Sequence, residues 1–388
     1  MEPKPVRRPD TPPNAGAGAA FLSLGPAGEG RERHRFAHEA MATIFEVIVA
    51  GETARYAGQA AQAAFREIDR IERLLSRYDP ASDVSQINRL RPGEAARIGF
   101  DAFECLEMAW RLHRETRGAF DATVGALVAL WRDSGLNAPR SGNAGAPPGV
   151  SRASRPPAEP LPPHPAHSST EDGAVAWRRV GVDRLELTAG EREDGPKEFT
   201  VRFLPGEDAP ADAPEGPLSA GGTDGEPKRP AIDLGGIGKG YALDRAAEAL
   251  REWSIESALV HSGGSTALAI GAPPGEKGWP VGVGGDHESL GAVGRILLKH
   301  GAVSGSGTEQ QGAHIIDPRT GRPVTGNRSA WARCSCAAEA DALSTAFMVM
   351  TPCEIEAFCA ARRDVAAMTV IEHASGGGSV FRFGPWED

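Results

Sequence analysis

The most informative segment of this sequence is IDLGGIGKGYALD, residues 232–244. A short apolar run leads into four glycines, with Lys239 among them, and a helical pattern follows. Glycine lets the backbone approach a ligand closely, and the N–H groups at a helix start attract anions, an effect that a lysine reinforces. The segment therefore predicts a strand over 231–234, a glycine turn and a helix over 240–253, with a phosphate as the expected ligand.

Two common phosphate-binding motifs do not fit this segment. A P-loop needs a glycine five residues before its Gly-Lys pair and a Ser or Thr after it, and those positions hold Asp233 and Gly240. A dinucleotide-binding fingerprint needs its last glycine where Tyr241 stands. A tight turn alone would explain one or two glycines but explains four glycines and a lysine poorly, so the pattern favours a binding role.

A second candidate site lies in ADALSTA, residues 340–346. Asp341 and Thr345 are four residues apart, so a helix would place them on one face, within reach of a shared cation. Carboxylate and hydroxyl oxygens suit Mg²⁺, which binds few protein groups and takes its other ligands from water and substrate phosphates. The same pattern equally fits a helix over 341–350 that Asp341 simply caps. Both alternatives stay open on this motif alone.

The segment HIIDPRTG, residues 314–321, combines a histidine and a carboxylate with a turn signal. His314 and Asp317 would form an acid/base pair beside an exposed turn. Alternatively, Asp317 serves only as a hydrogen-bond acceptor within that turn. This motif by itself does not choose between the two interpretations.

The segment TRGAFDATV, residues 116–124, places an aromatic ring and a carboxylate beside a glycine. Phe120 and Asp121 together suit a flat heterocycle, with the ring supplying an apolar face and the carboxylate a hydrogen-bond acceptor. Alternatively, Asp121 or Thr123 caps the helix that we expect over 123–131.

The remaining pattern predicts an α+β fold. Helical spacing is clearest over 53–75, whereas β-branched apolar runs such as 41–50 indicate buried strands. Helices and antiparallel-looking strands alternate without a regular βαβ cadence. The further predicted helices are 101–116 and 353–362, and the further predicted strands are 180–187, 198–204, 257–262, 266–271, 279–284, 293–300, 329–337, 366–372 and 379–383.

Composition excludes several classes of function. The chain has 388 residues, of which 52 are acidic and 42 basic, and the resulting net charge of −10 argues against a nucleic-acid binder. No apolar run reaches the roughly 18 to 20 residues of a membrane-spanning helix, so no transmembrane segment is expected. The five cysteines are odd in number and include no CxxC pair, so neither a disulfide framework nor a structural zinc site is predicted.

Two segments are too poor in bulky apolar residues to form a core. Residues 138–172 contain nine prolines among Ser, Ala and Gly, and residues 205–230 are acidic and rich in Gly and Pro. Both are predicted to be disordered insertions. Residues 1–35 are interpreted as a disordered tail, although Arg7-Arg8 before the weakly apolar stretch 15–24 also permits a feeble export signal.

Together, and in this order, the motifs resemble the FAD:protein FMN transferase (ApbE) family. The resemblance covers about residues 38–372 apart from the two low-complexity segments. The matching stretches are MAT (41–43), SRYDPASDVSQIN (76–88), TRGAFDATVGALVALW (116–131), IDLGGIGKGYALD (232–244), SGG (262–264), VSG (303–305), HIIDPRTGRP (314–323) and ADALSTA (340–346).

The resemblance implies a fold with mixed or antiparallel sheets, flanking helices and a cleft between two lobes that holds FAD, with Mg²⁺ on its pyrophosphate. It makes residues 36–388 one ApbE-like domain. The residues it places around FAD are Met41, Tyr78, Ala119, Phe120, Asp121, Asp233, Lys239 and Ile316. The residues it assigns to the metal are Asp341, Thr345 and Gly236, the last through its backbone carbonyl.

The resemblance further implies transfer of FMN from FAD to a threonine or serine hydroxyl of a partner flavoprotein, with release of AMP. We interpret His314 as the base that accepts the hydroxyl proton, Asp317 as the group that orients it, and Lys239 as the stabiliser of negative charge. Two alternatives remain, a Mg²⁺-dependent FAD pyrophosphatase that yields FMN and AMP and a non-catalytic FAD-binding protein. The chain as it reads favours the cytoplasm, whereas the family is usually exported to the periplasm or anchored to a membrane.

The sequence departs from the family pattern at a few positions. Ala42 stands where the family usually has Gly, and Ala122 stands where Pro is usual. Ser265 replaces a carboxylate or amide after the glycine pair, and the loop after Gly305 lacks the common aromatic residue and arginine. These changes leave the expected metal and pyrophosphate groups intact, but they bear on the choice of acceptor.

Overall fold

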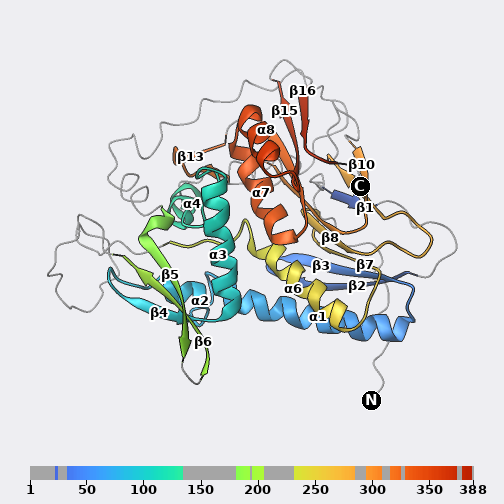
Figure 1. The fold of residues 1–388 in the computed structure, drawn as a ribbon, viewed down its shortest axis with the longest axis horizontal. Helices are drawn as coiled ribbons and strands as arrows, with labels where there is room; N and C mark the ends of the chain where they lie inside the picture. Colours follow the sequence, from blue (N-terminus) through green and yellow to red (C-terminus); the bar gives the residue numbers. More distant parts are fainter. Residues whose placement is uncertain are drawn as a thin grey trace, which may run out of the picture.

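The structure is a computed structural model that describes residues 22–24, 33–133, 181–192, 195–204, 231–284, 294–307, 315–324, 328–373 and 378–386. Its centre is an eight-stranded antiparallel sheet in the order β16-β15-β14-β11-β8-β7-β3-β2 (Figure 1). The strands are β2 (Arg33–Ala40), β3 (Thr43–Ala50), β7 (Ala258–Ser262), β8 (Thr266–Ile270), β11 (Gly301–Gly307), β14 (Arg328–Cys334), β15 (Ala366–Glu372) and β16 (Gly378–Phe383).

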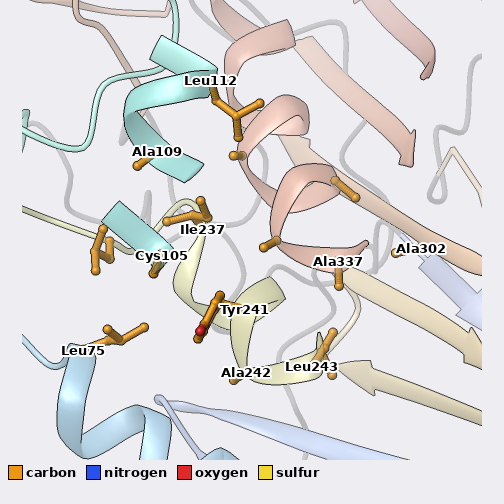
Figure 2. Close-up of a cluster of buried hydrophobic side chains, with 14 of the residues drawn as sticks. Leu75, Cys105, Ala109, Leu112, Ile237, Tyr241, Ala242, Leu243, Ala302 and Ala337 are labelled. Atoms are coloured by element: carbon orange, nitrogen blue, oxygen red, sulfur yellow. The ribbon is translucent and has the colours of Figure 1, made fainter. Parts of the chain in front are cut away.

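Helices cover one face of this sheet and bury the larger core. Figure 2 shows Ile237 and Tyr241 at the middle of that core, among side chains of α1, α3 and α7. The helices of the described chain are α1 (Ala54–Leu75), α2 (Asp83–Ile87), α3 (Phe100–Glu115), α4 (Gly125–Asp133), α6 (Gly238–Glu252), α7 (Ala337–Val349) and α8 (Pro352–Ala361). The sheet thus serves as a platform on which α6 and α7 lie next to each other.

Helix α1 shows why the periodicity could be read from the sequence. Its buried residues recur every three or four positions from Ala57 to Leu75, so one stripe faces the core. Thr53 caps its first turn by accepting a hydrogen bond from the Tyr56 N–H, and the chain leaves the helix at Ser76 in an extended conformation. The helix therefore delivers residues 76–78 to the region of the candidate site.

A three-stranded sheet covers the other face of the platform. It contains β1 (Leu22–Leu24), β9 (Trp279–Val283) and β10 (Gly294–Leu298), all antiparallel. A second core between the two sheets includes the fully buried Trp279 and Trp331. The prediction of a disordered tail over 1–35 is wrong at its C-terminal end, because β1 pairs with β9 and β2 begins at Arg33.

A separate small sheet lies on the other side of α3 from the large sheet (Figure 1). It consists of β4 (Ala95–Ile98), β6 (Gly195–Phe203) and β5 (Leu185–Arg192), and a short 3₁₀ turn over Val182–Arg184 precedes β5. The predicted hairpin of two strands is confirmed, with ends a few residues from the expected ones. A last two-stranded hairpin contains β12 (Ile316–Asp317) and β13 (Arg322–Pro323).

The α+β prediction is confirmed, and the described strands pair antiparallel throughout. Two element predictions are wrong. Residues 231–234 form no strand, because their backbone bonds to Ala122, Gly125 and the side chain of Asn88 rather than to a ladder. The Gly/Ser-rich segment 301–307 is absent from the predicted strands, but it is the central strand β11.

The start of α7 also differs from the prediction. The helix begins at Ala337, four residues before Asp341, so Asp341 lies inside it and does not cap it. The predicted insertions 138–172 and 205–230 lie outside the described residues, as does His314. None of the described helices is both long and apolar enough to cross a membrane.

Candidate functional site

The glycine turn is pressed against the start of α7. A methyl group placed on Gly240 would lie 2.2 Å from the carbonyl oxygen of Ala337, a separation that real side chains do not show. Only glycine therefore lets α6 and α7 approach this closely. The close approach brings the first turn of α6 alongside the second turn of α7, where Asp341 lies.

Asp341 and Lys239 meet at this junction. The Asp341 side chain is almost completely buried, with 4% of the residue exposed, and its Oδ2 accepts a hydrogen bond from the Gly240 N–H at 3.1 Å. The ammonium of Lys239 lies 3.6 Å from the same oxygen and donates to the Gly235 carbonyl at 2.9 Å. The two motifs that the sequence singled out therefore converge on one point, as expected.

Thr345 completes this cluster from one helical turn further along α7. A methyl group on Gly236 would lie 3.4 Å from Thr345 Oγ1 and 3.4 Å from Cε2 of Phe120. The missing side chain of Gly236 thus leaves a small space between the Thr345 hydroxyl and the Phe120 ring. A ligand atom, rather than protein, can occupy that space.

The donor set around this space fits a divalent cation with a preference for oxygen. Asp341 has a buried carboxylate, and Thr345 has a hydroxyl beside Gly236, whereas the Gly236 carbonyl stays a predicted ligand. The described residues contain no group of three His, Cys, Asp or Glu side chains that would hold a metal by themselves. A site with so few protein ligands suits Mg²⁺, which takes its other ligands from water and phosphate oxygens.

Asp233 sits at the entrance to the glycine turn. Its Oδ1 accepts a hydrogen bond from the Gly235 N–H at 3.0 Å, and its Oδ2 bonds the Arg77 guanidinium at 2.5 Å. The same guanidinium lies over the Tyr78 ring, 4.9 Å from its centroid. Tyr78 is 73% exposed.

Known proteins resemble this chain over most of its length. The ApbE family model matches residues 41–369 of the chain, which include every motif described above. The chain belongs to the ApbE family. Relatives named FAD:protein FMN transferase include one from Klebsiella pneumoniae, 26% identical over 323 residues that cover 80% of this chain and 77% of the relative. Another, from Salmonella typhimurium, is 26% identical over 320 residues, 80% of this chain and 76% of the relative.

Solved structures of the ApbE fold superpose on most of the chain. The flavin transferase ApbE from Vibrio cholerae gives a TM-score of 0.65 at 20% identity and covers 91% of this chain and 98% of its own. The flavinyl transferase ApbE of Pseudomonas stutzeri, in its apo form, gives 0.63 at 20% identity, covering 91% and 96%. These matches show that the fold is that of ApbE.

The ApbE motif at 116–124 packs beside the glycine turn. The Asp233 N–H bonds the Ala122 carbonyl at 2.8 Å, and the Gly125 N–H bonds the Ala231 carbonyl at 2.9 Å. Phe120 is buried, and its ring lies against Gly236. The side chains of Ala119 and Asp121 are also buried, so a ligand would meet this segment mainly through its backbone.

Asp121 is tied into its own turn and to a histidine. Its Oδ1 accepts hydrogen bonds from the N–H and the hydroxyl of Thr123, at 2.7 and 2.6 Å. Its Oδ2 lies 3.3 Å from Nδ1 of His113. Hydrogen bonding to Asp121 raises the pKa of His113 above its ordinary value, and partial burial of the ring offsets only part of this effect. The structure therefore gives Asp121 a local turn role, with its carboxylate already partnered.

Met41 occupies the two-residue turn between β2 and β3. Met41 and Ala42 both have positive φ, 49° and 56°, and the Met41 N–H bonds the Glu72 carboxylate of α1 at 2.7 Å. A turn with two positive φ values favours Gly at its second position. Glycine would therefore suit the position of Ala42, where the resemblance to the family led us to expect it.

The β12–β13 hairpin carries Ile316 and Asp317. Ile316 is buried, and Asp317 Oδ1 bonds the backbone N–H of Arg319 at 2.9 Å and its Nε at 3.1 Å. The side chain of Arg319 passes close to Gly118, which connects the hairpin to the end of α3. Asp317 is thus a turn acceptor paired with arginine. Because His314 lies outside the described residues, its relation to Asp317 stays a prediction.

Sequence reasoning gave no role to two residues that build the site. Asn88 accepts a hydrogen bond from the Ile232 N–H at 2.7 Å and donates to its carbonyl at 3.0 Å. Asp244 accepts from the N–H groups of Ala337 and Ala338, at 2.8 and 2.9 Å, and so caps α7 from another helix. Both residues lie inside motifs that match the ApbE family, and this position in a motif was the only sequence feature that could have indicated their roles.

Proposed function

We propose that this chain is a FAD:protein FMN transferase that moves FMN from FAD to a threonine or serine hydroxyl of a partner flavoprotein and releases AMP. Membership of the ApbE family and the names of the relatives support an enzyme of this kind. The observation that carries the proposal is the meeting of Lys239 and the buried Asp341 across the glycine turn.

Mg²⁺ would be held by Asp341, the hydroxyl of Thr345 and the backbone carbonyl of Gly236. The space beside Gly236 and the side-chain oxygens of Asp341 and Thr345 support this assignment. When bound, the ion neutralises charge on the diphosphate of FAD and so makes its phosphorus easier to attack. Lys239 lies next to this point and would bind a phosphate oxygen, which it can reach because its ammonium is only partly buried.

FAD would extend from this junction towards the residues that the ApbE resemblance assigns to it. Tyr78 lies at the surface, and the Arg77–Asp233 ion pair fixes that part of the chain. Backbone groups of 119–121 and the side chains of Met41 and Ile316 would supply the remaining contacts. The expected position of FAD in a cleft between lobes is part of this proposal.

The reaction itself would be attack by a hydroxyl oxygen of the acceptor on the phosphorus of the FMN half of FAD. One O–P bond forms, the P–O bond to the AMP half breaks, and the proton of the hydroxyl passes to a base. His314 is the proposed base. Asp317 was expected to orient His314, but its carboxylate accepts hydrogen bonds from Arg319. We therefore propose that Asp317 stabilises the hairpin that follows His314.

The proposal is tested by incubating the full chain with FAD, Mg²⁺ and a flavoprotein domain that carries an Asp-x-x-Thr/Ser-Gly-x-Thr/Ser segment. A mass gain of one FMN on the acceptor, with release of AMP, is the expected result. Free FMN with AMP on every acceptor tried would instead identify a FAD pyrophosphatase, and retention of intact FAD would identify a non-catalytic binding protein.

Two variants and one control variant sharpen the test. Asp341→Asn should abolish the mass gain while Glu107→Gln, which changes an exposed carboxylate on α3, should leave it unchanged. His314→Ala should reduce transfer strongly with FAD still bound. Full activity in His314→Ala would place the base elsewhere, and full activity in Asp341→Asn would overturn the metal assignment.

A further inference from the structure

A row of buried hydroxyl groups crosses the large sheet directly beneath α7. Ser262, Thr266 and Ser304 are successive partners in the register of β7, β8 and β11, and each is completely buried. Thr266 Oγ1 and Ser304 Oγ are 2.8 Å apart, and Ser344 Oγ of α7 is 3.4 Å from Ser304. Burying hydroxyls in a core is unfavourable unless they are bonded, so this row needs an explanation.

The row ends at a proposed metal ligand. Ser306, at the end of β11, has its Oγ 2.8 Å from Ser344 Oγ and 3.5 Å from Thr345 Oγ1. The neighbouring positions on the same sheet face, at Ala302, Ala330 and Ala332, are small and apolar, so this layer does not require hydroxyls for packing. The hydroxyls are concentrated at the part of the sheet that faces Ser344 and Thr345.

Proton counting and distances together assign a direction to these hydrogen bonds. Ser344 is within donor reach of two acceptors, the Asp341 carbonyl at 2.9 Å and Ser304 Oγ at 3.4 Å, and we assign its single proton to the carbonyl, which is nearer and can only accept. With this assignment, Ser306 is the donor in its contact with Ser344. With that proton used, Ser306 has none for Thr345, whose own proton goes to the Asp341 carbonyl at 3.2 Å. The oxygen of Thr345 therefore receives no hydrogen bond from this network.

We propose that Ser344 is a positioning residue for the cation site: it takes up the proton of Ser306 and so keeps the lone pairs of Thr345 available to the metal. The inference rests on the proposed function, since it assumes that Thr345 binds a cation. A hydroxyl oxygen that already accepts a hydrogen bond has less negative charge to offer, and partners behind a metal ligand commonly tune the affinity of the site.

The proposal makes a prediction in which a second substitution repairs the first. In Ser344→Ala, Ser306 loses its acceptor, and the nearest hydroxyl left to it in the network is that of Thr345. Cation affinity should fall by about tenfold, the lower end of the effect of removing such a partner. In the double variant Ser344→Ala/Ser306→Ala no proton is left to compete, so affinity should return close to that of the wild type. Ser306→Ala alone should bind as the wild type does.

The experiment measures Mn²⁺ binding to the full chain from the EPR signal of free Mn²⁺, with ADP present to supply a diphosphate. Thr369→Val is the matched control, because Thr369 is a buried hydroxyl on the same sheet with no hydrogen-bond partner among the described residues. Melting temperatures of all variants identify any loss of folding. Half-saturation by Mg²⁺ in the transfer assay gives a second readout, in which kcat at saturating Mg²⁺ should be unchanged.

The outcomes separate the inference from the function on which it rests. A wild type that binds no Mn²⁺, with or without ADP, would overturn the metal site and the inference with it. If the wild type binds and Ser344→Ala binds equally well, only the inference fails. A double variant weaker than Ser344→Ala would also overturn it, because purely structural roles of the two serines would add.

Discussion

The side-chain amide of Asn88 bonds both backbone groups of Ile232, accepting from the N–H at 2.7 Å and donating to the carbonyl at 3.0 Å. Asn88 ends the short helix α2, and Ile232 opens the segment that carries Asp233 and the glycines. The amide thus replaces the strand partner that residues 231–234 lack. Together with the Arg77–Asp233 ion pair, this side chain fixes the entrance to a site that is built from distant parts of the chain.

Substitution of Asn88 should therefore loosen the glycine turn. Asn88→Ala leaves both Ile232 groups without their partner, which costs about 1–3 kcal/mol per unpaired buried group. Asn88→Asp keeps the acceptor for the N–H but loses the donor to the carbonyl, so we expect an intermediate loss of unfolding free energy. Urea denaturation of the three proteins checks the order. Equal stability of the wild type and Asn88→Ala would show that the glycine turn keeps its conformation without the Asn88 side chain.

Asp244 should make stability depend on pH. Burial is the largest effect on this carboxyl and raises its pKa to about 6 from an ordinary value of 3.8, although the N–H groups of Ala337 and Ala338 lower it. The folded state then binds more protons than the unfolded state between these two values. The contribution of this group to the free energy of unfolding therefore falls as pH rises through that window, by up to about 3 kcal/mol.

The measurement compares the wild type with Asp244→Asn, which keeps an oxygen acceptor for α7 and cannot ionise. Chemical denaturation at several pH values from 4 to 7 gives the difference in unfolding free energy between the two proteins. That difference should shift in favour of Asp244→Asn as pH rises. A difference independent of pH would show that the carboxyl titrates at an ordinary value.

Ala42 should be a position where glycine is better than alanine. Its φ of 56° lies in the left-handed region, which costs a residue with a Cβ about 1–2 kcal/mol. Glycine avoids that strain but loses more chain entropy on folding, so we expect Ala42→Gly to raise the unfolding free energy by about 0.5–1 kcal/mol. Ala81→Gly, at an exposed turn residue without positive φ, is the control and should be slightly destabilising. A loss of stability in Ala42→Gly would show that the positive φ of Ala42 does not strain the turn.

The comparison of sequence and structure separates local from long-range information. Helix α1 and strand β7 were predicted well because their apolar periodicity is a local property. Strand β11 was missed because its Gly and Ser residues have low strand propensity, and only the packing of α7 on it explains them. The start of α7 was misplaced because its cap, Asp244, comes from another helix.

The candidate site shows the same division. The chemistry of Lys239, Asp341 and Thr345 could be predicted from residue types and spacing, and the family resemblance grouped them. Their convergence is a tertiary fact that no single motif contains. The roles of Asn88 and Ser344 depend on atoms within hydrogen-bond reach across the fold, so the sequence alone could not assign them.

Three glycines of one motif should respond differently to the same substitution. At Gly240 a methyl group would lie 2.2 Å from the Ala337 carbonyl oxygen, so Gly240→Ala should separate α6 from α7 and cost about 3 kcal/mol of stability. At Gly238 the nearest atoms are 3.8 Å away, an ordinary contact, and alanine is the better helix former. Gly238→Ala should therefore be as stable as the wild type and as active.

Substitution of Gly236 should impair function without lowering stability. A methyl group there would lie 3.4 Å from Thr345 Oγ1 and from the Phe120 ring. It would fill the space between them, but it would not overlap backbone atoms as a methyl group on Gly240 would. Gly236→Ala should keep a melting temperature near that of the wild type yet bind Mn²⁺ and transfer FMN poorly. Melting curves and Mn²⁺ titration of the three variants test this together. If Gly236→Ala bound Mn²⁺ as tightly as Gly238→Ala, the cation would have to lie away from the space between Gly236 and Thr345, because that space would already be occupied by the methyl group.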